Sequence, residues 1–569
     1  MKYFLPMLVT ATALLSACGG GGGDDAPPTA APAPPPSSAP VAGAPGAPPA
    51  PGATAVTVSG RVSFDFVPAT VTNGRPRLDY ANTARRPSRF VVVELIDAGN
   101  QAILASGRTN ASGDYSLQAP IGRSAFVRAS ARMTVSGTNT APIAVVDNTN
   151  QRAQWAIDGA RFNTSGAAVI TQNLHATSGW NGSSYVAAQR AAGPFAIIDT
   201  LYNATQRIIA VDSAIAFPPL TVNWSPNNIA SSGSLTQGQI TSSFFTFSSN
   251  GSTTTREMYI LGRADNDTDE YDAHVVTHEF GHYLQSAFSR DDSVGGPHGG
   301  TNDRLDMRVA FSEGWGNGWA GIALNNPVYV DTSQAGQGNG FSFNVSRGEG
   351  TNPGWFKESS VERMFWDLSN SSLGFGPVWA TMRNGLTTTA ALSSMHSFAN
   401  ALRLRVSASE VSNTLRPTLA RESIALPTDA YGAGETNFGT PVIANLSPIY
   451  LRYGTLNSSL ANVCVGNAAD PTRQFNKAGQ YRFVRVMLPT SGNRTLSLVR
   501  TSSTTGNTDP DFTVYNNLGE LFVANGTVNN SETVTRNLPA GDYVLAVTDF
   551  NLFSASGANN NACFTLTVR

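Results

Sequence analysis

The chain has 569 residues, 13% of them charged, and its 37 basic and 39 acidic side chains leave a net charge of −2. A charge this balanced excludes the basic surface that a nucleic-acid-binding protein needs, so we expect no nucleic-acid partner. The length exceeds what one hydrophobic core normally supports, so we expect several domains.

The N-terminus has the features of an export signal. Met1–Lys2 precede an apolar run from Tyr3 to Leu15, which is too short to cross a bilayer, and small residues follow up to Cys18. Residues 1–18 resemble a bacterial lipoprotein signal peptide. The resemblance implies that Cys18 carries a lipid that anchors the chain to a membrane, as an exported lipoprotein of the outer membrane or cell surface. A plain secretory signal with an incidental Cys is the alternative.

A linker and a β-rich segment follow. Residues 19–55 are almost entirely Gly, Pro, Ala and Ser, a composition that cannot bury a core, so we expect a disordered linker. Residues 56–145 contain β-prone runs separated by turn signals, such as Phe90–Ile96. Arg108–Tyr115 resembles the recurrent turn of carboxypeptidase-regulatory-like domains, which implies an N-terminal β-sandwich over 56–145.

Residues 146–455 mix helical and strand patterns, which predicts an α+β domain. Its most informative stretch is the H-E-x-x-H sequence from His278 to His282. On a helix, two rings four residues apart leave the same face, separated by about 40°. They can therefore bind one Zn²⁺, while Glu279 acts as general base toward a zinc-activated water. The helical context comes from apolar residues at three- and four-residue spacings, namely Val276, Phe280, Tyr283, Leu284 and Ala287.

A catalytic zinc usually takes three protein ligands, so a third must be found. Gln285 and Phe288 stand where an extended motif would place a Gly and a third His. Farther along, the sequence Ser-Glu-Gly-Trp-Gly at 312–316 lies in a predicted helix. Together with H-E-x-x-H, this run resembles the HEXXH-plus-Glu metallopeptidases (gluzincins), and in particular their fungalysin-like members.

This resemblance implies a ligand set and a mechanism. It makes His278, His282 and Glu313 the ligands of one catalytic Zn²⁺ and Glu279 the catalytic base. Asn317 stands where these families often place an Asp that orients a ligating His, so that supporting hydrogen bond would be neutral here.

Other polar residues near the motif have weaker interpretations. His298, in a Gly-rich segment, is the rival third ligand, and His274 is expected to lie outside the coordination sphere. The acidic run 265–270 lacks the Gly and the late Glu of an EF-hand loop, so we expect a solvated turn, and Ca²⁺ as a second cofactor is unsupported. Four candidates for stabilising the transition state rest on residue type alone: His396, Tyr450, Arg452 and Tyr453.

The last segment, 456–569, reads as short strands between Gly, Asn and Pro turns. Leu538–Tyr543 together with Asp509–Phe512 resembles the bacterial pre-peptidase C-terminal domain, which implies a second β-sandwich. Cys464 and Cys563 are expected to pair in an oxidising compartment. That disulfide would close a loop of about 100 residues, for which the chain-entropy model gives ~4.7 kcal/mol.

These observations predict a multidomain protein with an α+β zincin metallopeptidase core, flanked by an N-terminal and a C-terminal β-sandwich. The expected activity is zinc-dependent hydrolysis of a peptide or protein substrate. One alternative is a zinc hydrolase that acts on a non-peptide bond. The other is a surface-anchored binding protein with a zincin fold, although a purely structural zinc site has no use for a base such as Glu279.

Overall fold

The protein is described here from a computed structural model. The structure describes residues 41–42, 54–134, 142–165, 167–299, 303–348, 350–466, 475–526, 530–553 and 561–569. The predicted signal peptide, Cys18 and nearly all of the linker lie outside these residues. The described chain is multidomain and largely β, with its α-helices between residues 192 and 421. It divides into two compact units, Gly19–Phe280 with Ala323–Phe343, and Gly281–Ile322 with Asn344–Arg569.

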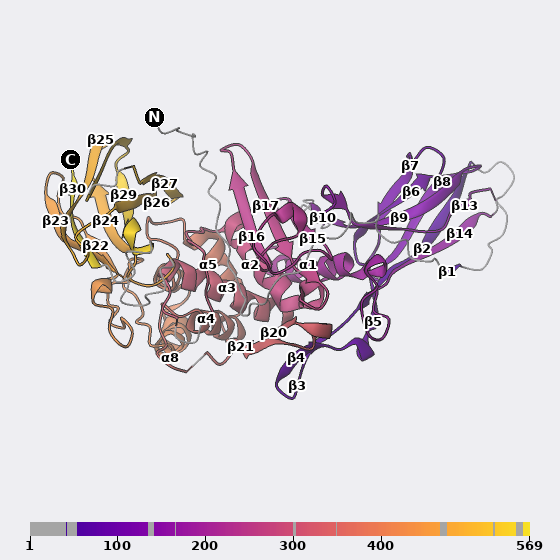
Figure 1. The fold of residues 1–569 in the computed structure, drawn as a ribbon, viewed down its shortest axis with the longest axis horizontal. Helices are drawn as coiled ribbons and strands as arrows, with labels where there is room; N and C mark the ends of the chain where they lie inside the picture. Colours follow the sequence, from indigo (N-terminus) through magenta and orange to yellow (C-terminus); the bar gives the residue numbers. More distant parts are fainter. Residues whose placement is uncertain are drawn as a thin grey trace. The chain divides into compact units, whose positions relative to one another are not determined.

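The larger sheet of the first unit is mixed, with the central strand order β16-β17-β15-β10-β9-β6-β7 (Figure 1). Neighbours β10, β15 and β17 are parallel, while β16 is antiparallel to β17. Helix α1 (Ala192–Ile209) lies in the crossover from β10 to β15 and packs its apolar face on β9 and β10. The central strands are β6 (Val91–Asp97), β7 (Ile103–Arg108), β9 (Ser124–Thr134), β10 (Pro142–Asp147), β15 (Leu220–Trp224), β16 (Phe244–Ser249) and β17 (Thr254–Ile260).

A second sheet of this unit is built around the long strand β2 (Ala55–Phe66), which pairs with β14, β5 and β8. Both sheets combine strands from before and after residue 145, and β10 itself crosses that predicted boundary. The division of the chain into three modules stays a prediction. The remaining strands of this part are β1 (Val41–Ala42), β3 (Ala69–Thr72), β4 (Arg75–Leu78), β5 (Ala84–Pro87), β8 (Asp114–Pro120), β11 (Ala153–Gln154), β12 (Ala156–Asp158), β13 (Phe162–Asn163) and β14 (Val169–Ala176).

A small antiparallel sheet leads into the histidine-bearing helix α2 (Ala273–Phe288). It consists of β18 (Gly262–Arg263), β19 (Asp267–Thr268), β20 (Val328–Ser333) and β21 (Asn339–Asn344). A 3-10 turn over Asp269–Tyr271 joins β19 to the helix.

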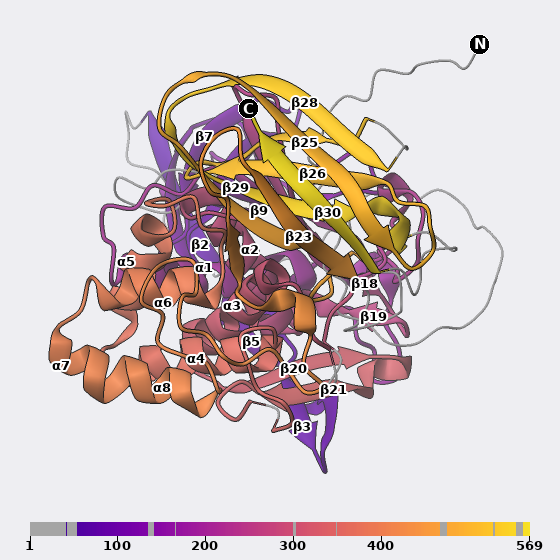
Figure 2. The ribbon, with the colours of Figure 1, turned by 90° about the vertical axis from the view of Figure 1, so that its left-hand side faces the viewer.

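The helices of the second unit surround α3 (Met307–Leu324), which is buried along nearly its whole length. Such a helix cannot be amphipathic, and its glycines let neighbouring helices approach closely. Figure 2 shows α4 to α8 grouped together. Their bounds are α4 (Glu358–Asn370), α5 (Phe375–Gly385), α6 (Met395–Arg403), α7 (Ala408–Glu410) and α8 (Arg416–Arg421). No helix in the described ranges is long and apolar enough to cross a membrane.

The C-terminal part of this unit is a sandwich of two mainly antiparallel sheets, ordered β22-β24-β29-β26-β27 and β23-β30-β25-β28 (Figures 1 and 2). Inward-facing apolar residues of both sheets form one core. Cys464 on β23 and Cys563 on β30 are register partners joined by a disulfide. The strands are β22 (Tyr450–Arg452), β23 (Ser459–Gly466), β24 (Arg482–Leu488), β25 (Gly492–Ser503), β26 (Pro510–Asn516), β27 (Gly519–Ala524), β28 (Ser531–Leu538), β29 (Gly541–Asp549) and β30 (Asn561–Val568).

Candidate metal centre

Helix α2 presents the H-E-x-x-H residues in the order that the sequence predicts. The helix starts directly after Asp272, whose carbonyl accepts a hydrogen bond from Val276 N at 3.1 Å. His278, Glu279 and His282 are buried, with 1%, 4% and 5% of their surface exposed. Because buried polar groups need partners, three such residues on one helix indicate a site rather than a solvated face.

The structure brings a third predicted residue to the two histidines. One ligand atom each from His278, His282 and Glu313 lies within 4.8 Å of the other two. Two imidazole nitrogens and a carboxylate oxygen, all buried, form a donor set that can hold a metal ion.

Glycines place the Glu313 helix in close contact with its neighbours. A Cβ on Gly314 would lie 2.5 Å from Val361 Cβ of α4, and one on Gly281 would lie 3.1 Å from Gly316 Cα of α3. Trp315 Nε1 donates to the carbonyl of Gly281 at 2.9 Å. The glycines therefore allow α2, α3 and α4 to pack with almost no space between their backbones, which fixes the position of Glu313.

A hydrogen-bonded relay sets the tautomer of His282. Ser312 Oγ lies 3.0 Å from Gln285 Oε1, to which it donates, and 3.2 Å from His282 Nδ1. Because the hydroxyl hydrogen is directed to Gln285, the Ser312 oxygen accepts the Nδ1–H of His282. The lone pair of this ring is then on Nε2, the nitrogen that lies 3.3 Å from Glu313 Oε2. Sequence reasoning missed this role of Ser312, although the residue stands next to Glu313.

The rival ligand His298 lies against Glu313. Its Nε2 is 3.2 Å from Glu313 Oε2, and its Nδ1 is 2.9 Å from Glu358 Oε2 on α4. Asn317 donates to Glu358 Oε1 at 2.6 Å and to Glu362 Oε2 at 3.1 Å. Asn317 thus donates to Glu358, the carboxylate that contacts His298. The sequence did not predict Glu358 as a partner of Asn317.

The electrostatic surroundings of His282 favour a cation. Burial works to lower its pKa, but the adjacent carboxylate of Glu313 acts in the opposite direction, and the net pKa of His282 is raised. A carboxylate that stabilises an added proton on a buried imidazole also stabilises a metal ion in the proton's place.

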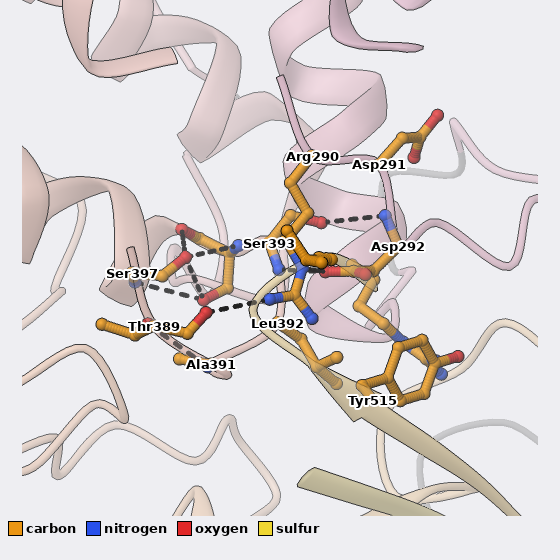
Figure 3. Close-up of polar contacts among 12 residues, drawn as sticks. Arg290, Asp291, Asp292, Thr389, Ala391, Leu392, Ser393, Ser397 and Tyr515 are labelled. Carbon is orange, nitrogen blue, oxygen red and sulfur yellow. Dashed lines mark hydrogen bonds and ion pairs between the residues drawn. The ribbon is translucent and has the colours of Figure 1, made fainter. Parts of the chain in front are cut away.

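The chain that leaves α2 is anchored by a buried ion pair (Figure 3). Arg290 Nε donates to Asp292 Oδ2 at 2.6 Å, and Arg290 Nη1 donates to the carbonyl of Thr389 at 3.0 Å. Ser393 N donates to the same Asp292 oxygen at 2.7 Å. These bonds connect the end of α2 to the segment before α6.

The remaining candidates have partners of other kinds. His274 is buried, and its Nε2 lies 3.1 Å from the carbonyl of Asn326. His396 contacts Glu435 at 3.1 Å, and Tyr450 OH accepts from Leu392 N at 3.0 Å. Arg452 is exposed beside Asp429, and Tyr453 OH donates to the carbonyl of Ser458.

Comparison with known proteins gives little further guidance. No protein-family model and no curated protein matches the chain. Among solved structures, 21% of this chain covers 94% of the pre-peptidase C-terminal domain of collagenase from Bacillus anthracis, at 13% identity and a TM-score of 0.15. A second match, which also covers 21% of this chain, spans 93% of PliG, a periplasmic inhibitor of g-type lysozyme from Aeromonas hydrophila, at 12% identity and a TM-score of 0.14. TM-scores of this size define neither a fold nor an activity for the chain.

Proposed function

We propose that this protein is a zinc metallopeptidase with a zincin core. The observation that carries the proposal is the mutual approach, within 4.8 Å, of ligand atoms from His278, His282 and Glu313. The donor set fits zinc, since two nitrogens and one carboxylate oxygen are the ligands of many catalytic zinc sites. The hydrogen bonds of Ser312 support a metal ligand at this position, because they leave His282 Nε2 unprotonated.

The chain's own residues account for the remaining chemistry. Zinc, when bound, would act as a Lewis acid and lower the pKa of a water molecule toward neutrality. Glu279 follows His278 on α2 and is buried, so it accepts the proton of the attacking water and delivers it to the leaving amine. Glu358 holds His298 through Nδ1, and Nε2 of the ring lies 3.2 Å from Glu313 Oε2.

The substitution Glu279→Gln tests the base. It should leave one zinc ion per chain and lower chelator-sensitive casein hydrolysis by about 10²- to 10⁴-fold, since general-base catalysis contributes that much. Glu410→Gln, at an exposed helix cap, is the control and should behave like wild type. Zinc without hydrolysis in wild type would favour another substrate bond, and wild-type protein without zinc would refute the proposal.

The third ligand is tested by metal content. Glu313→Ala should lower the zinc bound per chain, because two histidines alone hold zinc weakly. Unchanged zinc content in this variant, combined with loss of zinc in His298→Ala, would transfer the ligand role to His298.

A further inference from the structure

Four aspartates gather in the first unit, immediately ahead of α2. One oxygen each from Asp267, Asp269 and Asp331 lies within 4.8 Å of the other two. Asp269, Asp272 and Asp331 are 2%, 0% and 7% exposed. The solvated turn expected for residues 265–270 is therefore wrong at Asp269, because Ser243 and Asp331 of β20 lie against its carboxylate.

The sheet register explains how these side chains meet. Asp267 pairs with Ser333 across the antiparallel strands β19 and β20. Two residues on from Asp267 is Asp269, and two residues back from Ser333 is Asp331. Alternate residues of a strand share a face, so Asp331 lies on the same side as Ser333, the partner of Asp267. Asp269 opens the 3-10 turn that follows β19, and this turn brings its carboxylate to the other two.

Hydrogen bonds from neighbouring donors reach one oxygen of Asp272 and one oxygen of Asp269. Asp272 Oδ2 accepts from Thr332 N at 2.7 Å and from Thr332 Oγ1 at 2.9 Å. Asp269 Oδ2 accepts from Ser243 Oγ. In contrast, Oδ1 of Asp267, Asp269 and Asp272 is buried without a hydrogen-bond partner. A buried carboxylate oxygen without a partner carries a large desolvation cost, so these oxygens call for a ligand that is positively charged.

No side chain in the described ranges supplies that charge. The neighbouring Glu270 is paired with Arg190, whereas none of the four aspartates has a Lys, Arg or His ion-pair partner among the residues described. Burial raises the pKa of all four, and repulsion from neighbouring aspartates raises it further for Asp267, Asp272 and Asp331; the pKa of Asp269 rises to about 7.

We propose that Asp267, Asp269 and Asp331 bind a calcium ion, with Asp272 at the edge of the site. Donors that are all carboxylate oxygens select a hard cation, which separates this site from the nitrogen-containing centre on α2. Mg²⁺ usually keeps several waters and takes one or two carboxylates, whereas Ca²⁺ accepts six to eight oxygens in flexible geometry. Three converging carboxylates therefore fit calcium.

The position of the site suggests what calcium does for the fold. It would tie β19 to β20 directly before the first residue of α2, while Asp272 holds Thr332 through its other oxygen. Calcium would thus stabilise the start of the helix that carries His278. This proposal does not depend on the proposed peptidase activity.

Calcium binding to the full-length protein tests the site. Purified wild-type protein should contain about one calcium per chain by mass spectrometry. After calcium has been removed with EGTA, addition of CaCl₂ should raise the melting temperature of the protein by about 5 °C. Asp331→Asn should bind calcium at least about 10-fold more weakly. Asp147→Asn is the matched control, because Asp147 is also buried and accepts from the N and Oγ1 of a threonine, Thr149.

Several results would overturn the assignment. These are absence of calcium binding by wild type in a terbium luminescence titration, equal stabilisation by Mg²⁺, or equal loss of calcium in Asp147→Asn. The titration uses wild type, so it remains informative even where Asp331→Asn does not fold. Zinc content measured on the same samples separates failure of this site from failure of the centre on α2.

Discussion

At the scale of single residues, the structure adds Ser312 to the candidate centre. Its hydroxyl accepts from His282 Nδ1 and donates to Gln285, so Ser312→Ala removes the group that selects the tautomer. Loss of such a supporting hydrogen bond typically weakens metal binding by about 10- to 100-fold, and we expect this change in zinc affinity measured by competition with a chromogenic chelator. Ser393→Ala, which also removes a buried serine hydrogen bond, should leave the zinc affinity unchanged. Equal affinities of wild type and Ser312→Ala would remove Ser312 from the centre.

His274 makes the stability of the metal-free protein depend on pH. Burial lowers its pKa from 6.5 to about 4. Between pH 6.5 and about pH 4, His274 is therefore protonated in the unfolded chain and neutral in the folded chain. The stability contributed by neutral His274 is complete above pH 6.5 and is lost as the pH falls toward 4, by about 2 kcal/mol at pH 5. The free energy of unfolding in urea should be measured at pH 7 and at pH 5 for wild type and His274→Gln. Its decrease between the two pH values should be about 2 kcal/mol smaller in His274→Gln than in wild type. Equal decreases in the two proteins would contradict this role of His274.

At the scale of elements, α3 and α4 can pack this closely because α3 has glycines, which lack a side chain, at the contact. A methyl group on Gly314 would overlap Val361 Cβ at 2.5 Å and approach the Glu358 carbonyl at 2.9 Å. Overpacking of this kind costs about 1–3 kcal/mol, more than the ~1 kcal/mol that alanine gains in helix propensity. Gly314→Ala should therefore lower the free energy of unfolding in guanidinium. Gly376→Ala in α5, where the added methyl meets no atom within 4 Å, should leave the protein equally or more stable.

Elements that are determined by residues near one another in the sequence could be predicted, whereas features that depend on contacts between distant segments could not. Helix α2 follows from the three- and four-residue spacing of its apolar residues, and the run at 312–316 predicts the helix that carries Glu313. The relay from His282 to Ser312 could not be predicted, because it requires α3 to cross α2 at Gly281. The acidic run before α2 looked solvated for the same reason, since the strand that covers it follows α3.

At the scale of the whole molecule, strand patterns predicted β-rich ends but not the partners of each strand. The alternation in Phe90–Ile96 indicates a strand, yet only the fold shows that its sheet continues through β10 to β17. Cross-strand pairing joins residues far apart in sequence, so local periodicity carries no information about where one sheet ends. The pairing of Cys464 with Cys563 was easier to predict, because no third cysteine lies in that part of the chain.

Where the protein acts depends on the segment that precedes β2. We propose that Cys18 is lipidated after export and that the Gly-, Pro- and Ala-rich segment between Cys18 and β1 links it to the folded chain. Expressed in a Gram-negative host and labelled with an alkyne fatty acid, wild type should carry the label and sediment with membranes. Cys18→Ser should lose both properties while its purified form hydrolyses casein at the wild-type rate, and Ser16→Ala should keep the label. Wild type without label would show that the chain is exported by a plain secretory signal. Sedimentation of Cys18→Ser with membranes would show that another contact holds the chain there.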